Sequence, residues 1–401
     1  MSMNTNLTGS GVLSSTMQTY YDRKLLMNAK PKLCHQQYGQ KVLLPKNSGK
    51  AIQFRKWTPF PALLTALTEG VVPDGQSLSM TAITTDIEQY GGYVAVSDLL
   101  DMTALDPVIN DSVELMGDQG GLSIDTLVRD VITASTNVQY AGGKTARHKL
   151  TFETGDMNRL TVDEIRKAVR TLKKNKAPQF VRNGKGYYIA IVGPDTTYDL
   201  QSDPLWQDVS KYAASENIFE GEIGKLFGVV FVETSEARVF SALELIAGAS
   251  SLTVASYSNK VFTVNESISA GEASAMAGKS IILGSGVNAQ VLTIQSANGP
   301  AKTITVVETP TGTPGSGDKI YAYGAGDKAR SVAATLVFGK NAYGVVDLEG
   351  GNLRSIIKPK GSAGTADPLD QISTIGWKVD GFAAKVLQPL WLVRIEHTYS
   401  M

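Results

Sequence analysis

The sequence predicts an α+β protein that carries a small inserted all-β domain, and three observations support this prediction. One amphipathic pattern over residues 107–135 is long enough for a single continuous helix. Between residues 150 and 240, apolar runs of strand length alternate with helical patterns, as in a layer of helices on a sheet. Residues 245–318 lose most of their charge and contain short alternating runs separated by turn residues. Together these features predict one parent fold that the all-β domain splits.

The first 35 residues show little periodicity and are predicted to form an N-terminal arm that needs a partner surface to become ordered. Residues 36–159 follow as extended segments and the long helix. Prolines and glycines between residues 57 and 75 break any helix there, and Pro73-Asp74-Gly75 is typical of a turn. We therefore expect a hairpin with a long, exposed apolar tip, which a lone domain rarely shows without a partner. The tip residues are Trp57, Phe60, Leu63 and Leu64.

The clearest helix begins at Asp106-Pro107, because Asp is a favoured N-cap and Pro loses no hydrogen bond at the first helical position. Apolar side chains at spacings of four and three then predict one buried stripe: Ile109, Val113, Met116, Gly120, Ile124, Leu127 and Val131. A helix of this length spans roughly 45 Å. Gly117, Gly120 and Gly121 interrupt its middle, each less favourable than Ala by about 1 kcal/mol. They predict a bend or a close backbone contact.

Residues 160–244 are predicted to form the first part of an α/β domain. Thr161-Val162-Asp163-Glu164 fits a capping box, in which the Thr hydroxyl and the Glu carboxylate each bond an amide at the helix start. The continuous apolar run at 187–192 predicts a central buried strand, and the run at 229–232 predicts the next one. Pro194-Asp195 begins another helical segment between them.

The inserted all-β domain is predicted to cover residues 245–326. The 74 residues from 245 to 318 contain only seven charged side chains, and they are rich in Ser, Thr, Gly, Ala and Val. Strand character of the parent domain resumes at 333–338 and ends with 390–395. Residues 327–401 should therefore complete the α/β domain and return to the region of the long helix.

The zero net charge conceals two opposite blocks. Residues 22–56 hold nine basic side chains and one acid, a net charge of +8, whereas residues 86–130 hold ten acids and one base, a net charge of −9. Each block alone would be a solvated surface, but opposite blocks on neighbouring stretches favour a contact within or between subunits. On the basic side we expect contacts from Lys41, Lys46, Lys50, Arg55 and Lys56. On the acidic side we expect contacts from Asp101, Asp111, Glu114, Asp118 and Asp125.

Residues that would support catalysis or metal binding are sparse. The three histidines, His35, His148 and His397, and the single Cys34 form no ligand spacing typical of zinc. Cys34 and His35 are adjacent, and adjacent side chains rarely point at one another as nucleophile and base must. Residues 277–280 resemble the end of a phosphate-binding loop, but Ala273 stands where its first glycine is required. We therefore expect no enzyme activity, no cofactor and no metal.

The composition excludes two further classes. The N-terminus has no basic region followed by an apolar run, so no secretory signal is expected. No apolar stretch approaches the roughly 18 residues needed to cross a bilayer, so no membrane partner is expected. One cysteine cannot form an internal disulfide framework and is typical of a protein made in a reducing cytoplasm.

Nine stretches carry a resemblance to a known family: YYDRKLLMNAKPKLCHQQYGQ at 20–40, LTEGVVPDGQ at 67–76, SDLLDMTALDPV at 97–108, NVQYAGG at 137–143, LTVDEIRKAVRTLKKN at 160–175, YDLQSDPLWQDVSKYA at 198–213, EGEIGKLFGVVFVETSEA at 220–237, GKNAYGVVDLEGG at 339–351 and KGSAGTADPLDQISTIGWK at 360–378. In this order they resemble the major capsid proteins of tailed bacteriophages, in particular phages related to the short-tailed coliphage N4, a branch of the HK97-like fold. None lies in the 245–318 segment.

The resemblance implies an HK97-like capsid fold with an N-terminal arm at 1–35, an E-loop within 45–85, a P-domain built on a spine helix at 107–135, and an A-domain from 160 to 350. It implies subunits that form hexamers and pentamers of an icosahedral phage head enclosing double-stranded DNA, assembled in the host bacterial cytoplasm. Portal, scaffolding and decoration proteins are the further partners it implies, with packaged DNA contacted nonspecifically on the inner face.

Two other functions stay open at this point. The same fold builds cellular nanocompartments, and a shell protein of that kind would enclose enzymes instead of DNA. A second alternative is a binding role in addition to the capsid role, in which the β-insert recognises a host surface or a decoration protein. The phage-type motifs favour the capsid interpretation.

Overall fold

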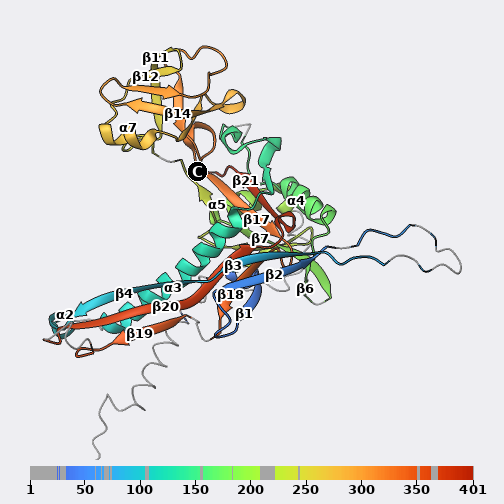
Figure 1. Cartoon of the computed structure of the whole chain (residues 1–401). Coiled ribbons are helices and arrows are strands. Elements are labelled where there is room, and N and C mark those ends of the chain that lie inside the picture. The colour runs from blue at the N-terminus through green and yellow to red at the C-terminus, as the bar shows by residue number, and fades with distance from the viewer. Residues whose placement is uncertain are drawn as a thin grey trace, which may run out of the picture. The chain divides into compact units, whose positions relative to one another are not determined.

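The structure is a computed structural model that describes residues 25, 27, 33–58, 60–64, 66, 72, 75–103, 108–153, 157–182, 184–207, 222–242, 244–349, 353–362 and 369–400. The chain divides into two compact units (Figure 1). Unit 1 comprises residues 1–132 and 341–388, and unit 2 comprises residues 133–340 and 389–401. Each unit therefore combines segments that are distant in the sequence. Most of the predicted arm lies outside the described residues.

Unit 1 contains a five-stranded sheet in the order β1-β18-β20-β19, with β4 also paired to β20. Its strands are β1 (Gln40–Leu44), β4 (Glu88–Ser97), β18 (Tyr343–Leu348), β19 (Arg354–Lys358) and β20 (Ile372–Val386). The first half of β20 pairs with β4 and β19, and its second half pairs with β18. The long strand β20 therefore joins all parts of the sheet. The short helices η2 (Gln36–Tyr38) and α2 (Asp98–Thr103) precede β1 and follow β4.

Helix α3 (Val108–Thr133) runs along the β4–β20–β19 part of this sheet (Figure 1). Val113, Met116 and Ile124 are buried as predicted, but the last turns bury Val128 and Ile132 instead of Leu127 and Val131. The predicted stripe is wrong there because the buried face advances in steps of four from Ile124. Ile109 belongs to the residues whose side chains the structure does not describe.

The glycines of α3 lie on its buried side, and the helix is continuous through Gly117, Gly120 and Gly121. A Cβ at position 120 would lie 3.2 Å from a Leu353 methyl carbon and 3.2 Å from the Trp377 ring. Close packing on the sheet therefore explains Gly120. A bend of the spine helix in other subunit environments stays a prediction.

A two-stranded antiparallel sheet of unit 1 forms the hairpin, with β2 (Ala51–Trp57) and β3 (Met80–Asp86). Its register runs from the pair Ala51 and Asp86 to the pair Trp57 and Met80. Phe54 is the buried residue of β2, and a Cβ at Gly344 of β18 would lie 2.6 Å from its ring. The absence of a side chain at 344 therefore lets the base of the hairpin pack on the five-stranded sheet.

Unit 2 contains an eight-stranded sheet in the order β5-β21-β17-β7-β9-β8, with β10 paired to β17 and β6 paired to β7. Its strands are β5 (Val138–Tyr140), β6 (Phe180–Arg182), β7 (Lys185–Val192), β8 (Glu222–Leu226), β9 (Val229–Glu233), β10 (Val239–Phe240), β17 (Val332–Phe338) and β21 (Leu392–His397). Residues 188–192 of β7 are buried between β17 and β9. Ile165, Ala168 and Leu172 of helix α4 (Val162–Lys174) belong to the same core. Helix α5 (Pro194–Gln201) follows β7.

The start of α4 differs from the predicted capping box. Thr161 is the N-cap residue but makes no side-chain cap hydrogen bond. Instead, the Asp203 carboxylate accepts the Val162 amide at 3.0 Å. The Glu164 carboxylate, which is buried, accepts hydrogen bonds from the Gln139 side chain at 2.7 Å and the Gly142 amide at 3.3 Å. The prediction is wrong because the Glu164 carboxylate bonds Gln139 and Gly142, and a carboxylate from a distant loop bonds the first amide of the helix.

Six strands of unit 2 form a closed barrel in the order β11-β12-β15-β14-β13-β16. They are β11 (Ser251–Ser258), β12 (Val261–Val264), β13 (Ser280–Leu283), β14 (Gln290–Asn298), β15 (Thr303–Val306) and β16 (Lys319–Ala322). Helix α7 (Ala270–Met276) starts with a capping box between Ser269 and Glu272. The short 3-10 helices of unit 2 are η3 (Ala141–Gly143), η4 (Arg147–Lys149), η5 (Gly286–Asn288), η6 (Asp327–Ala329) and η8 (Pro389–Trp391).

His397 at the end of β21 predicts an acid-sensitive step in the stability of unit 2. Its ring is buried, with Nδ1–H donating to the Thr398 carbonyl at 2.9 Å and Nε2 accepting from the Thr335 hydroxyl at 3.0 Å. Burial lowers the pKa of His397 from 6.5 to about 4. Between these values the unfolded chain binds a proton that the folded chain does not, so folding stability falls as the pH falls.

We expect His397 to contribute a loss of roughly 3 kcal/mol in the free energy of unfolding between pH 7 and pH 4. Urea denaturation of the wild type and of His397→Gln at several pH values measures this contribution as the difference between the two pH profiles. Parallel profiles would contradict the assignment.

Candidate assembly surfaces

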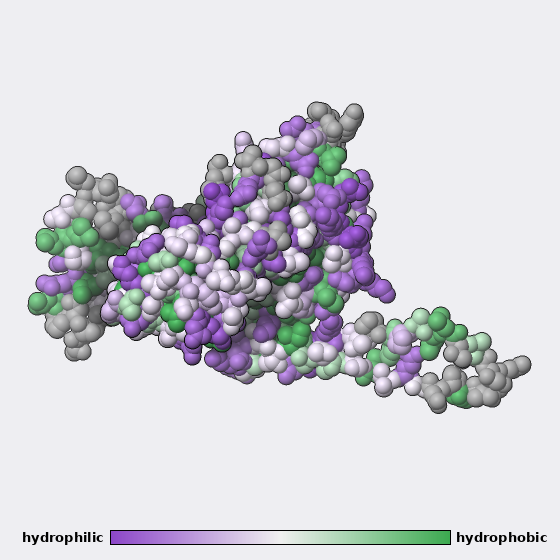
Figure 2. All heavy atoms as spheres, turned by 90° about the horizontal axis from the view of Figure 1, so that it is seen from above, coloured by the Kyte–Doolittle hydropathy of each residue, from purple (hydrophilic) through white to green (hydrophobic). Residues whose placement is uncertain are grey.

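The loop between β2 and β3 presents apolar side chains to solvent. Trp57 and Phe60 are about half exposed, and Leu63 and Leu64 are 78% and 92% exposed. Figure 2 shows hydrophobic atoms along the part of this loop that the structure describes. A monomeric protein gains nothing from exposing such a segment, because each leucine loses about 1.5–3 kcal/mol of burial energy. The loop therefore has the properties of a surface that a partner covers.

Four of the five predicted basic contact residues are exposed: Lys41, Lys46, Lys50 and Arg55. Lys56 is only partly exposed, and its ammonium group donates to the Gln388 side chain of its own subunit at 2.5 Å. The positive charge of Lys41 interacts with the Asp347 carboxyl of its own sheet. Burial raises the pKa of this carboxyl, and the charge of Lys41 partly opposes the rise. Lys46, Lys50 and Arg55 are consequently the best candidates for a contact with a neighbour.

The predicted acidic residues fall into three groups. Asp111, Glu114 and Asp118 are exposed on α3, on the side that also carries the exposed Leu115 and Leu122. The side chain of Asp101 lies outside the described residues. Asp125 is completely buried, so its predicted role as a contact between subunits is wrong. It faces the interior because the same helical face that carries Ile124 and Val128 turns toward the core.

Asp125 instead binds the segment that precedes β1. Its Oδ1 accepts the His35 backbone amide at 2.6 Å, and its Oδ2 accepts the His35 ring Nδ1–H at 2.6 Å. The Gln36 amide donates to Oδ1 at 3.4 Å, and the Tyr343 hydroxyl donates to the His35 carbonyl at 2.5 Å. Burial, with Asp125 nearby, raises the pKa of the Cys34 thiol to about 12, so this thiol stays protonated and unreactive. The cluster fixes residues 34–36 to α3.

A second apolar surface lies around α2, at the end of unit 1 where β4 ends and β20 begins. The Asp98 amide donates to the Gln371 carbonyl at 2.8 Å and holds these two segments together. The exposed apolar residues are Leu99, Leu100, Met102, Leu369 and Ile372. The sequence analysis missed this surface, although three apolar residues within a six-residue helix are a visible signal.

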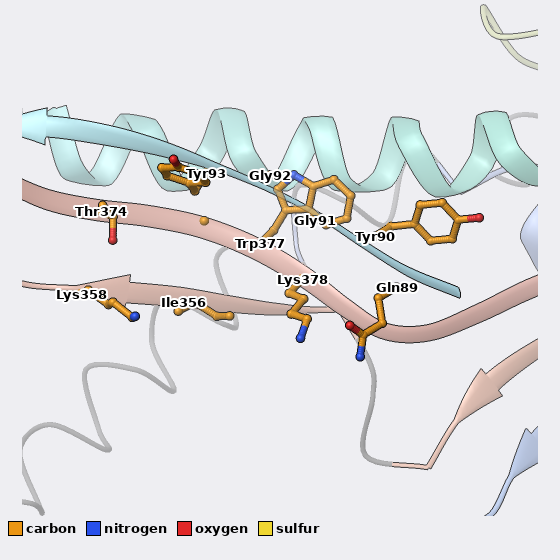
Figure 3. Close-up of a pocket in the computed structure, with 11 residues that line it drawn as sticks. Gln89, Tyr90, Gly91, Gly92, Tyr93, Ile356, Lys358, Thr374, Trp377 and Lys378 are labelled. Carbon is orange, nitrogen blue, oxygen red and sulfur yellow. The ribbon is translucent and has the colours of Figure 1, made fainter. Parts of the chain in front are cut away.

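A groove of about 460 Å³ lies on the open face of the β4–β20–β19 sheet (Figure 3). Trp377 points toward α3 and donates to the Gln119 side chain at 2.9 Å, whereas Gln89 and Lys378 point to the opposite face. Gly376 and Tyr93 are paired across the strands and line the groove. The described lining contains no carboxylate, histidine, serine or cysteine.

No group of three or more His, Cys, Asp and Glu side chains is arranged to hold a metal ion within the described part of the chain. No helix among the described segments is both long and apolar enough to cross a membrane. The prominent features of the described surface are therefore apolar and charged contact surfaces.

The sequence pattern of the family described as phage capsid protein matches residues 72–305, which is more than half of the chain. The chain belongs to the phage capsid protein family. The matched region covers β3, α3, α4 and most of the barrel. No curated protein matches the chain.

Solved phage heads share the fold of this capsid protein over most of both chains. The capsid of Ralstonia phage GP4 matches with a TM-score of 0.56 at 12% identity, covering 91% of this chain and 88% of that chain. The capsid of cyanophage P-SCSP1u matches with 0.51 at 13% identity, covering 91% and 88%. The head of Helicobacter pylori bacteriophage KHP40 matches with 0.51 at 11% identity, covering 90% and 87%.

These matches confirm the predicted α+β, HK97-like fold class and the predicted function. The protein is a structural major capsid protein of a tailed phage, a component of the virion that assembles with itself into the head shell. The family favours the phage head over the cellular nanocompartment. Membership of the N4-like branch stays a prediction from the sequence motifs.

Proposed function

We propose that the subunits form hexamers and pentamers that close into an icosahedral head around double-stranded DNA, in the cytoplasm of the host bacterium. We assign residues 1–35 to the arm, 36–159 to the E-loop and P-domain, 160–244 and 327–401 to the A-domain, and 245–326 to the insert. Portal, scaffolding and decoration proteins are the further proposed partners, and packaged DNA contacts the inner face nonspecifically.

The contact we propose places the β2–β3 hairpin of one subunit on the exposed face of a neighbour's α3. The observation that carries it is the match between two surfaces of mixed character. The hairpin combines exposed apolar side chains at its tip with Lys46, Lys50 and Arg55 nearer its base. The exposed face of α3 combines Leu115 and Leu122 with three carboxylates. Apolar contact supplies the affinity, and fixed charges of opposite sign select the register.

Replacing Leu63 and Leu64 with Asp tests the hairpin contact. We expect the double variant to stop at small oligomers, because each contact loses about 3 kcal/mol or more of apolar burial. Electron microscopy and sedimentation velocity of the expressed full chain measure the outcome. The control is Val307→Asp, at a half-exposed apolar position of the barrel, which should assemble as the wild type does. Normal shells from the double variant would rule out the loop as an assembly contact.

A second role, in which the barrel binds a host surface or a decoration protein, is favoured by the way the barrel uses its charges. Six of the seven charged side chains between residues 245 and 318 bond to backbone groups of the barrel or its flanking segment, including Glu266 to the Thr253 amide and Glu308 to the Thr293 amide. A surface with few cations is poorly suited to DNA, since nonspecific DNA binding depends on Lys and Arg. We therefore propose that the barrel lies on the outer face of the shell.

Deleting the barrel should leave assembly intact. Phe240 of β10 pairs with Val332 of β17, so residues 241–331 can be replaced by an Asn-Gly turn that joins two paired strands. We expect this variant to form shells of normal size in electron micrographs. Circular dichroism shows whether the deletion variant is folded. A folded variant that forms no shells would make the barrel an assembly element.

A further inference from the structure

Hydrogen bonds of Arg147 and Asp327 tie the connections between the barrel and the eight-stranded sheet to the parent domain. The chain enters the barrel after β10 and returns at β17, and these two strands pair with each other. A barrel joined only by these two connections would rotate about them. Two further groups, outside the barrel strands, bind the connections to the parent domain.

The first group is Arg147 of η4, whose guanidinium contacts both connections at once. Its Nε and Nη2 donate to the two carboxylate oxygens of Glu396 in β21, at 2.6 and 2.7 Å. Its Nη1 donates to the carbonyl of Gly324 in the returning connection at 3.1 Å. Its planar face lies 3.4 Å from the ring centre of Phe240, at the start of the outgoing connection. We call this set of contacts the Arg147 bracket.

Glu396 makes the Arg147 bracket rigid because it is itself fully buried and fixed. Arg394 also contacts Glu396, at 2.8 Å, so two guanidinium groups hold one carboxylate in the sheet. A bidentate Arg–carboxylate pair fixes the plane of the guanidinium, which a single ammonium contact does not. Arg147 thereby holds the Gly324 carbonyl at a fixed position relative to β21.

The second group is Asp327 of η6, which we call the Asp327 bracket. Its backbone amide donates to the Leu150 carbonyl of the parent domain at 3.0 Å. Its side-chain Oδ1 accepts the amide of Gly286, in the barrel loop between β13 and β14, at 2.8 Å. Asp327 is only 5% exposed. One residue of the returning connection therefore joins a barrel loop to the parent domain at a third point.

We propose that the Arg147 and Asp327 brackets hold the barrel in one orientation on the eight-stranded sheet, so that the two move as one body. Besides the two chain connections, the bonds to Gly324 and Gly286 attach the returning connection and a barrel loop, and they oppose rotation of the barrel about the connections. This goes beyond the proposed capsid contacts and does not depend on them. A partner bound to the barrel would accordingly transmit force to the parent sheet and not merely to a flexible tether.

Hydrogen–deuterium exchange of the unassembled full chain tests the proposal. In the wild type, amides in peptides covering 284–290 and 323–331 should be protected well beyond the rate of an unstructured peptide. Asp327→Ala removes the acceptor for the Gly286 amide and should speed exchange there by roughly tenfold or more, while barrel peptides covering 252–254 and 304–306 stay protected. Arg147→Lys keeps the positive charge but lacks the planar fork, and should speed exchange at 323–326.

Two matched controls separate the brackets from general damage. Asp327→Asn keeps an amide oxygen that can accept the Gly286 amide, and should restore wild-type exchange. Glu153→Gln breaks the exposed Glu153–Lys328 ion pair of 2.7 Å beside the same connection, and should change nothing. If Asp327→Ala does not fold, Arg147→Lys still decides the outcome. The proposal is overturned if wild-type residues 323–331 exchange like unstructured peptide, or if Asp327→Ala and Arg147→Lys exchange as the wild type does.

Discussion

Replacing Asp125 with alanine is expected to destabilise unit 1 by about 3–5 kcal/mol, because it removes one side of a buried, hydrogen-bonded pair. The His35 amide, the His35 ring Nδ1–H and the Gln36 amide would all lose their acceptor. A loss of this size is a large fraction of the 5–15 kcal/mol that stabilises a typical domain. The segment before β1 should detach from α3, and shell formation should fail. Urea denaturation of the unassembled subunit measures the loss.

Asp118→Ala is the matched control for this effect. Asp118 lies on the same helix but is exposed, so its replacement should change the free energy of unfolding by no more than about 0.5 kcal/mol. Asp125→Asn keeps one oxygen for the backbone amides but turns an NH2 group toward His35, and should fall between the two. An Asp125→Ala variant that unfolds at the same urea concentration as Asp118→Ala would show that the pair contributes nothing.

Reversing the charge of Lys46, Lys50 and Arg55 to Glu is expected to abolish assembly while the subunit stays folded. Each exposed pair contributes only about 0–1 kcal/mol, so stability of the subunit changes little. In the proposed head, however, the same contact recurs around every capsomer, and three repulsive pairs in each contact would oppose every docking event. Sedimentation velocity at about 0.15 M salt, where the screening length is about 8 Å, should show small species only.

Restoring complementarity is the decisive control for the charge reversal. Changing Asp111, Glu114 and Asp118 to Lys in the reversed subunit should recover shells, because the signs match again across the contact. Reversing the exposed Lys173, Lys174 and Lys185 of unit 2 should leave assembly unchanged. A reversed subunit that assembles normally, or that the second set of changes does not rescue, would refute the contact between the hairpin and α3.

Elements whose burial follows from a local run of residues were predictable from the sequence. Strand β7 is an example, because its apolar run predicts a central strand without knowledge of its neighbours, and it lies between β17 and β9. The hairpin and α3 were also predictable from local signals, the hairpin from its prolines and glycines and α3 from its apolar spacing. The fold class then followed from the order of these elements and from the resemblance to phage capsids.

Interactions that join distant residues were not predictable from the sequence. A count of acids in residues 86–130 cannot distinguish the buried Asp125 from the exposed Asp118. The partner of Asp125 is His35, 90 positions away, and only the tertiary structure brings them together. The start of α4 failed similarly, because Asp203 and not Thr161 caps the first amide. In both cases the hydrogen-bond partner is a residue far away in the same chain, which the local sequence pattern does not reveal.

The pairing of β1 with β18 and of β4 with β20 has a consequence for the order in which the chain folds on the ribosome. Among the strands that the structure describes, the sheet partners of β1 and β4 lie within residues 343–386, so both strands emerge with unpaired edges and wait for most of the chain to be synthesised. The barrel, in contrast, closes within residues 251–322 and can form as soon as that stretch has emerged. During synthesis the barrel is folded while β1 and β4 still expose edges open to wrong partners, which makes this interval the one in which a chaperone is of most use.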